Sequence, residues 1–165
     1  MTAARPLMDR DGIAARIPHA GTMCLLDRLI AWDERRIVCE ADSHRSPTNP
    51  LRSASGLLVG AAIEYAAQAM ALHGALLGEQ VGEQIGEAAS GSDREPPKPG
   101  FLASARGVDF ACWRLDERVG PLCIEVVRQA GDAQQILYQF SVRHGQDTLA
   151  SGRAAVVLNT PVTPT

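Results

Sequence analysis

A long run of small and apolar residues, SGLLVGAAIEYAAQAMALHGALL at positions 55–77, is the feature that most limits how this chain can fold. Its content of Ala and Gly predicts a helix that neighbouring backbone can approach closely. One carboxylate, Glu64, and one amide, Gln68, lie four residues apart in its middle, and therefore on one face of the helix. We expect a buried helix with a single polar stripe.

Glu64 is the best candidate for a functional residue in this stripe. A carboxylate removed from water is costly unless it finds partners or keeps its proton through a raised pKa. A carboxylic acid held in that state can act as a general acid near neutral pH. The alternative is a structural carboxylate that binds backbone groups or a basic residue such as Arg106. For Gln68 we expect orientation of the acid, a bond to the sheet, or a contact with substrate.

Composition indicates an ordinary globular protein rather than a membrane or nucleic-acid protein. The run at 55–77 is long enough to span a bilayer, but it contains Glu64, Gln68 and His73 and has no flanking basic cluster. The 165 residues, 45% hydrophobic and 21% charged, suit a single domain over 1–165. A net charge of −3 and scattered Arg residues give no reason to expect nucleic acid. The amino terminus lacks the apolar core of a signal peptide, so we expect a cytoplasmic protein.

Alternating apolar and polar residues predict β-strands on both sides of the helix. We expect a short helix over 9–17 and strands over 29–32, 36–42, 101–110, 122–129, 135–144 and 149–158, the last four as an antiparallel meander. Together these elements predict an α+β domain in which an antiparallel sheet of about six strands wraps one long buried helix. The Gly-, Glu- and Pro-rich stretch 78–100 predicts a mobile segment, and 160–165 a frayed tail.

Three motifs resemble the 3-hydroxyacyl-[acyl carrier protein] dehydratases. The opening reads IPH at 17–19 and MCLLDR at 23–28, similar to the family's LPHR…(F/M)LLVDR, and IEYAAQ at 63–68 is similar to its EA-x-AQ signature. GFLASAR at 100–106 resembles the strand after the helix in a divergent branch associated with aryl-polyene biosynthesis. The resemblance covers most of 13–158 and implies a hotdog fold, a curled antiparallel sheet around the helix. It also implies a homodimer, or a heterodimer with another hotdog subunit.

The resemblance also implies an activity. Family members reversibly remove water from a 3-hydroxyacyl thioester, linked to acyl carrier protein or coenzyme A, and give a trans-2-enoyl thioester in fatty-acid or polyene-type biosynthesis. A histidine removes the proton beside the carbonyl, the helix acid Glu64 protonates the departing hydroxyl, and a backbone N–H near the helix start polarises the carbonyl. No metal or organic cofactor is needed. A basic landing patch for an acidic carrier would draw on four arginines: Arg16, Arg45, Arg52 and Arg106.

The chain departs from the family at two places. The family's catalytic histidine lies in a GHFP segment upstream of the acid, and this chain has TNPLR at 48–52 instead. The family's helix-start glycine also has no partner in register, since Gly60 lies four residues before Glu64, one fewer than in the family. Gly56 and Gly60 both remain candidates for the N–H donor that binds substrate.

Two explanations of the missing histidine stay open. In the first, His19 in the opening loop supplies the base, although a lone histidine is as often a capping or packing residue. In the second, the chain is a non-catalytic or partner-dependent subunit of a heteromeric dehydratase. An acyl thioesterase is a third possibility, because a helix carboxylate such as Glu64 can activate water when no histidine is available.

The remaining histidines and cysteines are weaker candidates. His44 is a secondary choice for the base, His73 lies half a turn from the face of Glu64, and His144 ends a strand. Cys39 and His44 have a possible ligand spacing, but two residues do not make a metal site. The four cysteines lack paired spacing and are expected to be mostly reduced thiols: Cys24, Cys39, Cys112 and Cys123.

Overall fold

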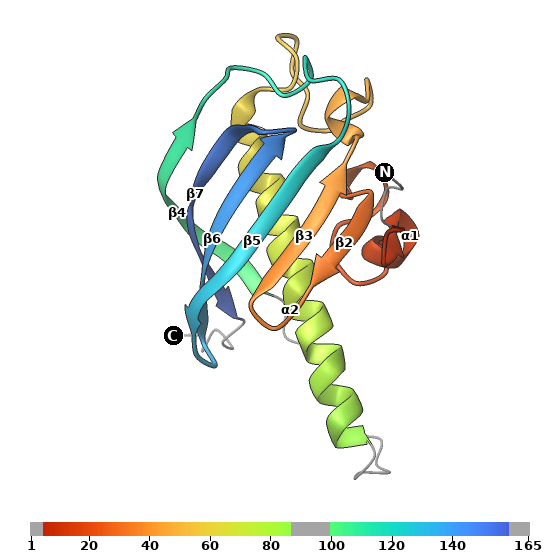
Figure 1. The fold of residues 1–165 in the computed structure, drawn as a ribbon, viewed down its shortest axis with the longest axis vertical. Helices are drawn as coiled ribbons and strands as arrows, with labels where there is room; N and C mark the ends of the chain where they lie inside the picture. Colours follow the sequence, from red (N-terminus) through yellow and green to blue (C-terminus); the bar gives the residue numbers. More distant parts are fainter. Residues whose placement is uncertain (1–4, 87–99, 159–165) are drawn as a thin grey trace, which may run out of the picture.

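The computed structural model describes residues 5–86 and 100–158, and Figure 1 shows their arrangement. In chain order the helices and strands are β1 (Met8–Asp9), α1 (Arg10–Ala14), β2 (Arg28–Trp32), β3 (Arg36–Ala41), α2 (Ala62–Gly86), β4 (Gly100–Phe110), β5 (Leu122–Gly131), β6 (Gln135–His144) and β7 (Asp147–Leu158). Short 3-10 helices lie at Gly21–Met23, Ser43–Arg45 and Val59–Ala61.

The strands form one antiparallel sheet in the order β1-β2-β3-β5-β6-β7-β4. The sheet curls around α2, which runs behind the central strands and extends beyond them at its carboxyl end (Figure 1). This is the expected hotdog arrangement, an α+β domain with a curled sheet around one long helix. The sheet has seven strands rather than about six because the two-residue β1 pairs with β2.

The predicted four-strand meander is wrong in one respect. β5, β6 and β7 do pair in sequence, but β4 pairs with β7 and forms the edge of the sheet. The second neighbour of β5, on the side away from β6, is β3, which comes before the helix in sequence. Alternating residues identify a strand but do not decide which strand lies beside it, and here α2 carries the chain across to the far edge.

The core lies between the inner face of the sheet and α2. Alternate residues of the central strands are fully buried, among them Ile124 and Val126 on β5 and Phe140 on β6. They face small helix residues such as Ala66 and Ala69, whose exposure is 0%. Burying a side chain the size of Ile or Phe contributes about 1.5–3 kcal/mol, so this layer supplies much of the driving force for folding.

The long helix ends later than the sequence predicts. Residues 78–86 of the expected mobile segment belong to α2. Glu79, Gln80 and Glu83 favour helix, and Oε1 of Glu79 lies 2.8 Å from Nε of Arg16, which ties this part of α2 to the amino-terminal segment. The rest of that segment, 87–99, and the tail 160–165 lie outside the described residues.

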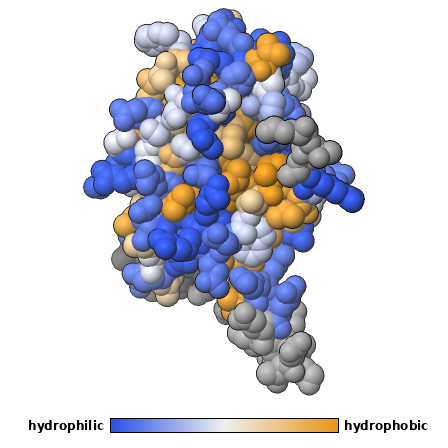
Figure 2. Space-filling view, in the orientation of Figure 1, coloured by the Kyte–Doolittle hydropathy of each residue, from blue (hydrophilic) through white to orange (hydrophobic). Residues whose placement is uncertain are grey.

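The outer face of the sheet is mainly polar. Figure 2 shows mostly hydrophilic side chains in the orientation of Figure 1, with hydrophobic side chains gathered near the amino-terminal residues. On β6 the exposed and buried residues alternate along most of the strand. One face therefore meets solvent and the other packs on α2, as expected for an antiparallel sheet.

Candidate active site

Glu64 lies in the first turn of α2, and its side chain is 33% exposed. It is less buried than the sequence suggests, because it lines a cavity between α2 and the strands β4 to β7. Its carboxyl group contacts two polar side chains. These partners are His19 and Gln68.

The structure brings His19 to Glu64. Nε2 of His19 lies 3.0 Å from Oε1 of Glu64, and the imidazole is 24% exposed. His19 belongs to the loop between α1 and the 3-10 helix Gly21–Met23, and Nδ1 has no hydrogen-bond partner among the described residues. A histidine and a carboxylate at this distance can share or exchange a proton, which general acid–base chemistry requires.

Gln68 holds the loop that follows His19 and also contacts the acid. Its Oε1 accepts a hydrogen bond from the Leu25 N–H over 2.8 Å, and its Nε2 donates to the Met23 carbonyl over 2.7 Å. A third, longer contact of 3.3 Å runs from Nε2 to Oε1 of Glu64. Both N–H groups are therefore used within the protein. In this state Gln68 is placed to orient the acid, and the expected contact with substrate stays a prediction.

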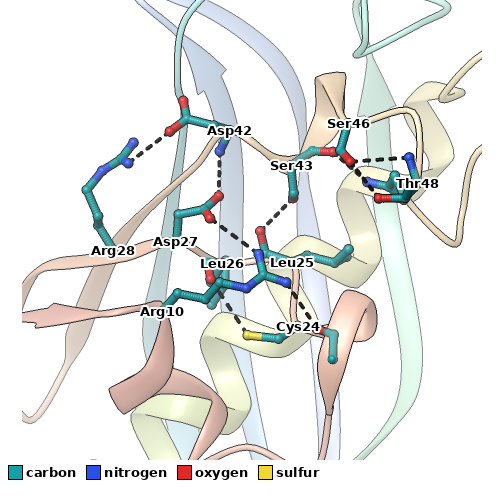
Figure 3. Close-up of polar contacts among 12 residues, drawn as sticks. Arg10, Cys24, Leu25, Leu26, Asp27, Arg28, Asp42, Ser43, Ser46 and Thr48 are labelled. Carbon is teal, nitrogen blue, oxygen red and sulfur yellow. Dashed lines mark hydrogen bonds and ion pairs between the residues drawn. The ribbon is translucent and has the colours of Figure 1, made fainter.

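Further bonds fix the same loop against the start of the sheet (Figure 3). Oδ2 of Asp27 accepts from the Asp42 N–H over 2.7 Å, and Nη1 of Arg10 lies 3.3 Å from Oδ1 of Asp27. The hydroxyl of Ser43 donates to the Leu25 carbonyl over 2.6 Å. These contacts hold the segment that follows His19 against α1 and the residues just after β3.

His19 and Glu64 lie on the wall of a cavity of about 900 Å³. Its lining comes from the His19 loop, one face of α2, and strands β4 to β7: Ala15 to His19, Glu64, Ala67, Met70, Ala71, Gly74, Ala75, Leu77, Gly100 to Leu102, Arg128, Asp132, Ile136, Tyr138, Val156 and Leu158. Small residues form most of the cavity wall that α2 contributes. Such a cavity suits an extended, mainly apolar ligand.

The two candidate glycines lie in different surroundings. Gly56 has φ of +96° in a tight turn, and its N–H donates to the Ser53 carbonyl over 3.0 Å, so that N–H is not free for a ligand in this conformation. Gly60 lies in the 3-10 helix that leads into α2, and a Cβ added there would meet nothing within 4 Å. Neither residue is part of the cavity lining.

The other three histidines bind elsewhere. Nε2 of His44 lies 2.8 Å from the Arg118 carbonyl oxygen, and Nε2 of His144 lies 2.6 Å from the Val119 carbonyl oxygen. His73 lies between the Tyr138 hydroxyl and the Asp33 carbonyl oxygen in the turn that joins β2 and β3. Burial lowers the pKa of both His44 and His73, which keeps these imidazoles neutral.

The segment that replaces the family's GHFP histidine has a structural role. Nδ2 of Asn49 donates to the Ser43 carbonyl over 2.9 Å and to the Tyr65 hydroxyl over 3.2 Å. The Tyr65 hydroxyl also lies 2.7 Å from Oγ of Ser43, and burial raises its pKa to about 12. Tyr65 is therefore a buried packing residue whose hydroxyl has partners within the protein. Asn49 was missed by sequence reasoning, because nothing in TNPLR marks it as the partner of a buried hydroxyl.

Two of the four arginines of the expected carrier patch are paired within the chain. Arg16 binds Glu79, and Nη2 of Arg52 lies 3.6 Å from Oδ2 of Asp116. No group of three His, Cys, Asp or Glu side chains that could hold a metal occurs in residues 5–86 and 100–158. The four cysteines are free thiols. Within the described ranges, neither helix combines the length and the apolar character needed to cross a membrane.

The sequence and the fold were compared with known proteins. Residues 12–163 match the family described as ApeP-like, ApeP dehydratase. Among curated proteins no sequence matches this chain.

Solved structures share the fold at low sequence identity. The dehydratase heterocomplex ApeI:P from Xenorhabdus doucetiae superposes with a TM-score of 0.70 at 20% identity, covering 90% of this chain and 91% of that one. A thioesterase from Staphylococcus aureus gives 0.54 at 12% identity over 81% and 93% of the two chains. The PaaI protein of E. coli gives 0.51 at 17% identity over 78% and 80%. These likenesses show the hotdog fold. Because the family match spans nearly the whole sequence, the chain belongs to the ApeP-like dehydratase family, the aryl-polyene-type branch that its motifs resemble.

Proposed function

We propose that this protein dehydrates 3-hydroxyacyl thioesters to trans-2-enoyl thioesters in fatty-acid or polyene-type biosynthesis. The observation that carries the proposal is the 3.0 Å contact between His19 and Glu64 on the wall of the cavity. Elimination of water needs a base at the carbon beside the thioester carbonyl and an acid at the next carbon, so the two groups must lie close together. The substrate carries its own phosphopantetheine arm, and we propose no further cofactor.

In the proposed reaction neutral His19 removes the proton from the carbon beside the carbonyl. Protonated Glu64 gives its proton to the hydroxyl on the next carbon, the carbon–oxygen bond breaks, water leaves and the double bond forms. The enzyme is then left with a protonated imidazole and a carboxylate. Because Nε2 of His19 is in direct contact with Glu64, a proton can pass from the imidazolium to the carboxylate, which gives a neutral imidazole and a carboxylic acid again.

The thioester carbonyl also needs a hydrogen-bond donor while negative charge develops on its oxygen. The start of α2 is the natural source, since the positive end of the helix dipole lies there. Between the two glycine candidates Gly60 is favoured, because the Gly56 N–H already binds Ser53.

A thioesterase is the second candidate, favoured by the carboxylate on the cavity wall and by thioesterases among the proteins with the same fold. In that reaction Glu64 would activate a water molecule that attacks the thioester carbonyl and releases the thiol. The position of His19 argues for dehydration, because water-activating chemistry needs one general base whereas the contact supplies two coupled proton-transfer groups.

We further propose that the protein works with a second hotdog subunit, as a homodimer or a heterodimer, in the cytoplasm. The edge strand β4 supports this proposal. Its Phe101 is 60% exposed and its Phe110 46% exposed, and an unpaired apolar edge favours pairing with another strand. The structural neighbour ApeI:P is itself a heterocomplex. A partner that pairs with β4 would lie beside the cavity, whose wall includes Phe101 and Leu102.

The partner proposal is tested by particle mass. Light scattering of the protein, alone and with a co-expressed hotdog subunit, should give a dimer that the double substitution Phe101→Lys with Phe110→Lys dissociates. Leu137→Lys on β6, 42% exposed, is the matched control and should leave the dimer intact. A monomer under both conditions would contradict the partner proposal.

The activity is tested by following enoyl product and free thiol separately. Wild-type protein, Glu64→Gln and His19→Ala are incubated with 3-hydroxyacyl thioesters on coenzyme A and on carrier protein. We expect wild type to form enoyl thioester without thiol and both variants to lose that activity. Glu83→Gln and His144→Ala are matched controls, since Glu83 is exposed far along α2 and His144 binds the Val119 carbonyl.

The other outcomes separate the alternatives. Thiol release that depends on Glu64 would identify a thioesterase. Enoyl product that appears only when the partner subunit is added would identify a partner-dependent subunit. Enoyl formation unchanged in His19→Ala would contradict the role of His19.

A further inference from the structure

The cavity continues well beyond the proposed catalytic pair. Its lining follows one face of α2 from Glu64 to Gly74 and Leu77, and at a rise of about 1.5 Å per residue the ten residues to Gly74 span about 15 Å. Between the two ends the helix presents Ala67 and Ala71, and a Cβ at Gly74 would meet nothing within 4 Å. An extended chain held at Glu64 therefore has an open apolar path to the far end.

That far end is polar, unlike the path that leads to it. Arg128 on β5 is directly opposite Tyr138 on β6 in the sheet register, so both side chains lie on the inner face. Arg128 continues the buried inner row of Ile124 and Val126 and is itself half-buried. Among residues 5–86 and 100–158, its guanidinium makes no ion pair and donates no hydrogen bond. A half-buried guanidinium with free donors is well suited to bind an oxygen atom.

Tyr138 is held in one orientation by a relay of hydrogen bonds through the buried His73. Nε2 of His73 lies 2.8 Å from the Asp33 carbonyl oxygen, which can only accept, so Nε2 carries the proton. Nδ1 of neutral His73 is then an acceptor, and the Tyr138 hydroxyl 2.9 Å away donates to it. The hydroxyl oxygen keeps lone pairs that can accept one more hydrogen bond. Tyr138 lines the cavity, and its relay plays no part in the proposed elimination.

We propose that Arg128 and Tyr138 form a subsite that binds a hydroxyl group at the far end of the acyl chain. A hydroxyl fits both partners, since it can accept from the guanidinium and donate to the Tyr138 oxygen. A plain hydrocarbon end would leave Arg128 partly desolvated without a partner. This inference rests on the proposed function for the orientation of the substrate, with its thioester at Glu64.

The test measures binding rather than turnover, so that it does not depend on catalysis. Calorimetric titration compares a saturated acyl pantetheine of medium chain length with its counterpart hydroxylated at the last carbon. We expect wild type to bind the hydroxylated ligand about tenfold more tightly. Arg128→Met and Tyr138→Phe should each remove most of this preference and change the binding of the plain ligand little. Arg153→Met is the matched control on β7, because it is exposed and outside the cavity lining.

Two further variants test whether the ligands occupy the cavity and whether the subsite is independent of catalysis. Gly74→Leu should fold, since the added side chain points into open space and Leu favours helix, and it should block both ligands. Glu64→Gln should keep the hydroxyl preference, so a failure of the proposed dehydratase activity is distinguished from a failure of the subsite. Equal binding of the two ligands by wild type, or no binding of either, would overturn the inference. Equal losses for both ligands in Arg128→Met would do the same.

Discussion

The backbone N–H of Leu25 donates to Oε1 of Gln68 over 2.8 Å, joining two residues 43 positions apart. Replacing Gln68 by Leu would leave that N–H and the Met23 carbonyl without partners in the interior. We expect a loss of about 1–3 kcal/mol in the free energy of unfolding, measured in urea. Because the freed loop carries His19, we also expect kcat to fall more than KM rises. Gln139→Leu at an exposed position of β6 is the control. An unchanged kcat would show that the amide does not position the pair.

Alanine substitutions should separate the two glycines before α2. At Gly56 the added Cβ would lie 2.6 Å from Nε of Arg114, and φ of +96° disfavours any side chain, so Gly56→Ala should lower the melting temperature clearly. Gly60→Ala should leave it unchanged or slightly raised. If the Gly60 N–H polarises the thioester, its alanine variant keeps that N–H but crowds the ligand, so KM should rise at constant stability. Equal melting temperatures for the two variants would contradict the structural difference.

Tyr65 should matter for stability and not for chemistry. Tyr65→Phe removes a buried hydroxyl that binds Ser43 and Asn49, and we expect the free energy of unfolding to fall by about 1 kcal/mol. The pH profile of kcat should keep its shape, since the hydroxyl does not belong to the cavity wall. A shifted pH profile would instead assign Tyr65 a part in proton transfer.

Stability should decline in mildly acidic solution. Burial lowers the pKa of His44 and His73 below 6.5 in the folded protein, so below about pH 6.5 the unfolded chain binds protons that the folded chain does not. The free energy of unfolding should therefore be highest at about pH 8. It should fall towards about pH 5, because protonation of these imidazoles favours the unfolded chain. Urea titrations at the two pH values measure this. His73→Phe should reduce the difference, whereas His144→Gln serves as a control, and a flat profile in wild type would contradict the prediction.

Most of the fold follows from local sequence pattern. Period-two alternation identifies β5, β6 and β7 almost to the residue, and the small-residue run identifies α2. The position of β4 does not follow, because its alternation fits either a neighbour of β5 or an edge beside β7. The carboxyl end of α2 was missed for a different reason. Repeated glycines at 78, 82 and 86 predict a loop. The Glu and Gln residues between them and the Arg16–Glu79 pair nevertheless stabilise the helix.

The candidate site could be predicted in part. The spacing of Glu64 and Gln68 places them on one helix face, and the structure shows their contact. The approach of His19 depends on the path of a loop. Hydrogen bonds from distant segments to the backbone of that loop, such as the one from the Ser43 hydroxyl, determine this path. No local pattern reveals those bonds. The proximity of Arg128 and Tyr138 could not be predicted either, because it depends on the register between β5 and β6.

The position of β3 beside β5 has a consequence for how the chain is made. Arg36 on β3 and Glu125 on β5 are paired across 89 positions, with α2 and β4 between them in sequence. During synthesis β3 is therefore made before β5, so one edge of β3 has no strand to pair with. β5 is synthesised only after α2 and β4. Such distant pairing slows folding and leaves an open strand in the nascent chain. The amino-terminal half cannot complete its sheet alone, so productive folding must wait for the carboxyl-terminal strands.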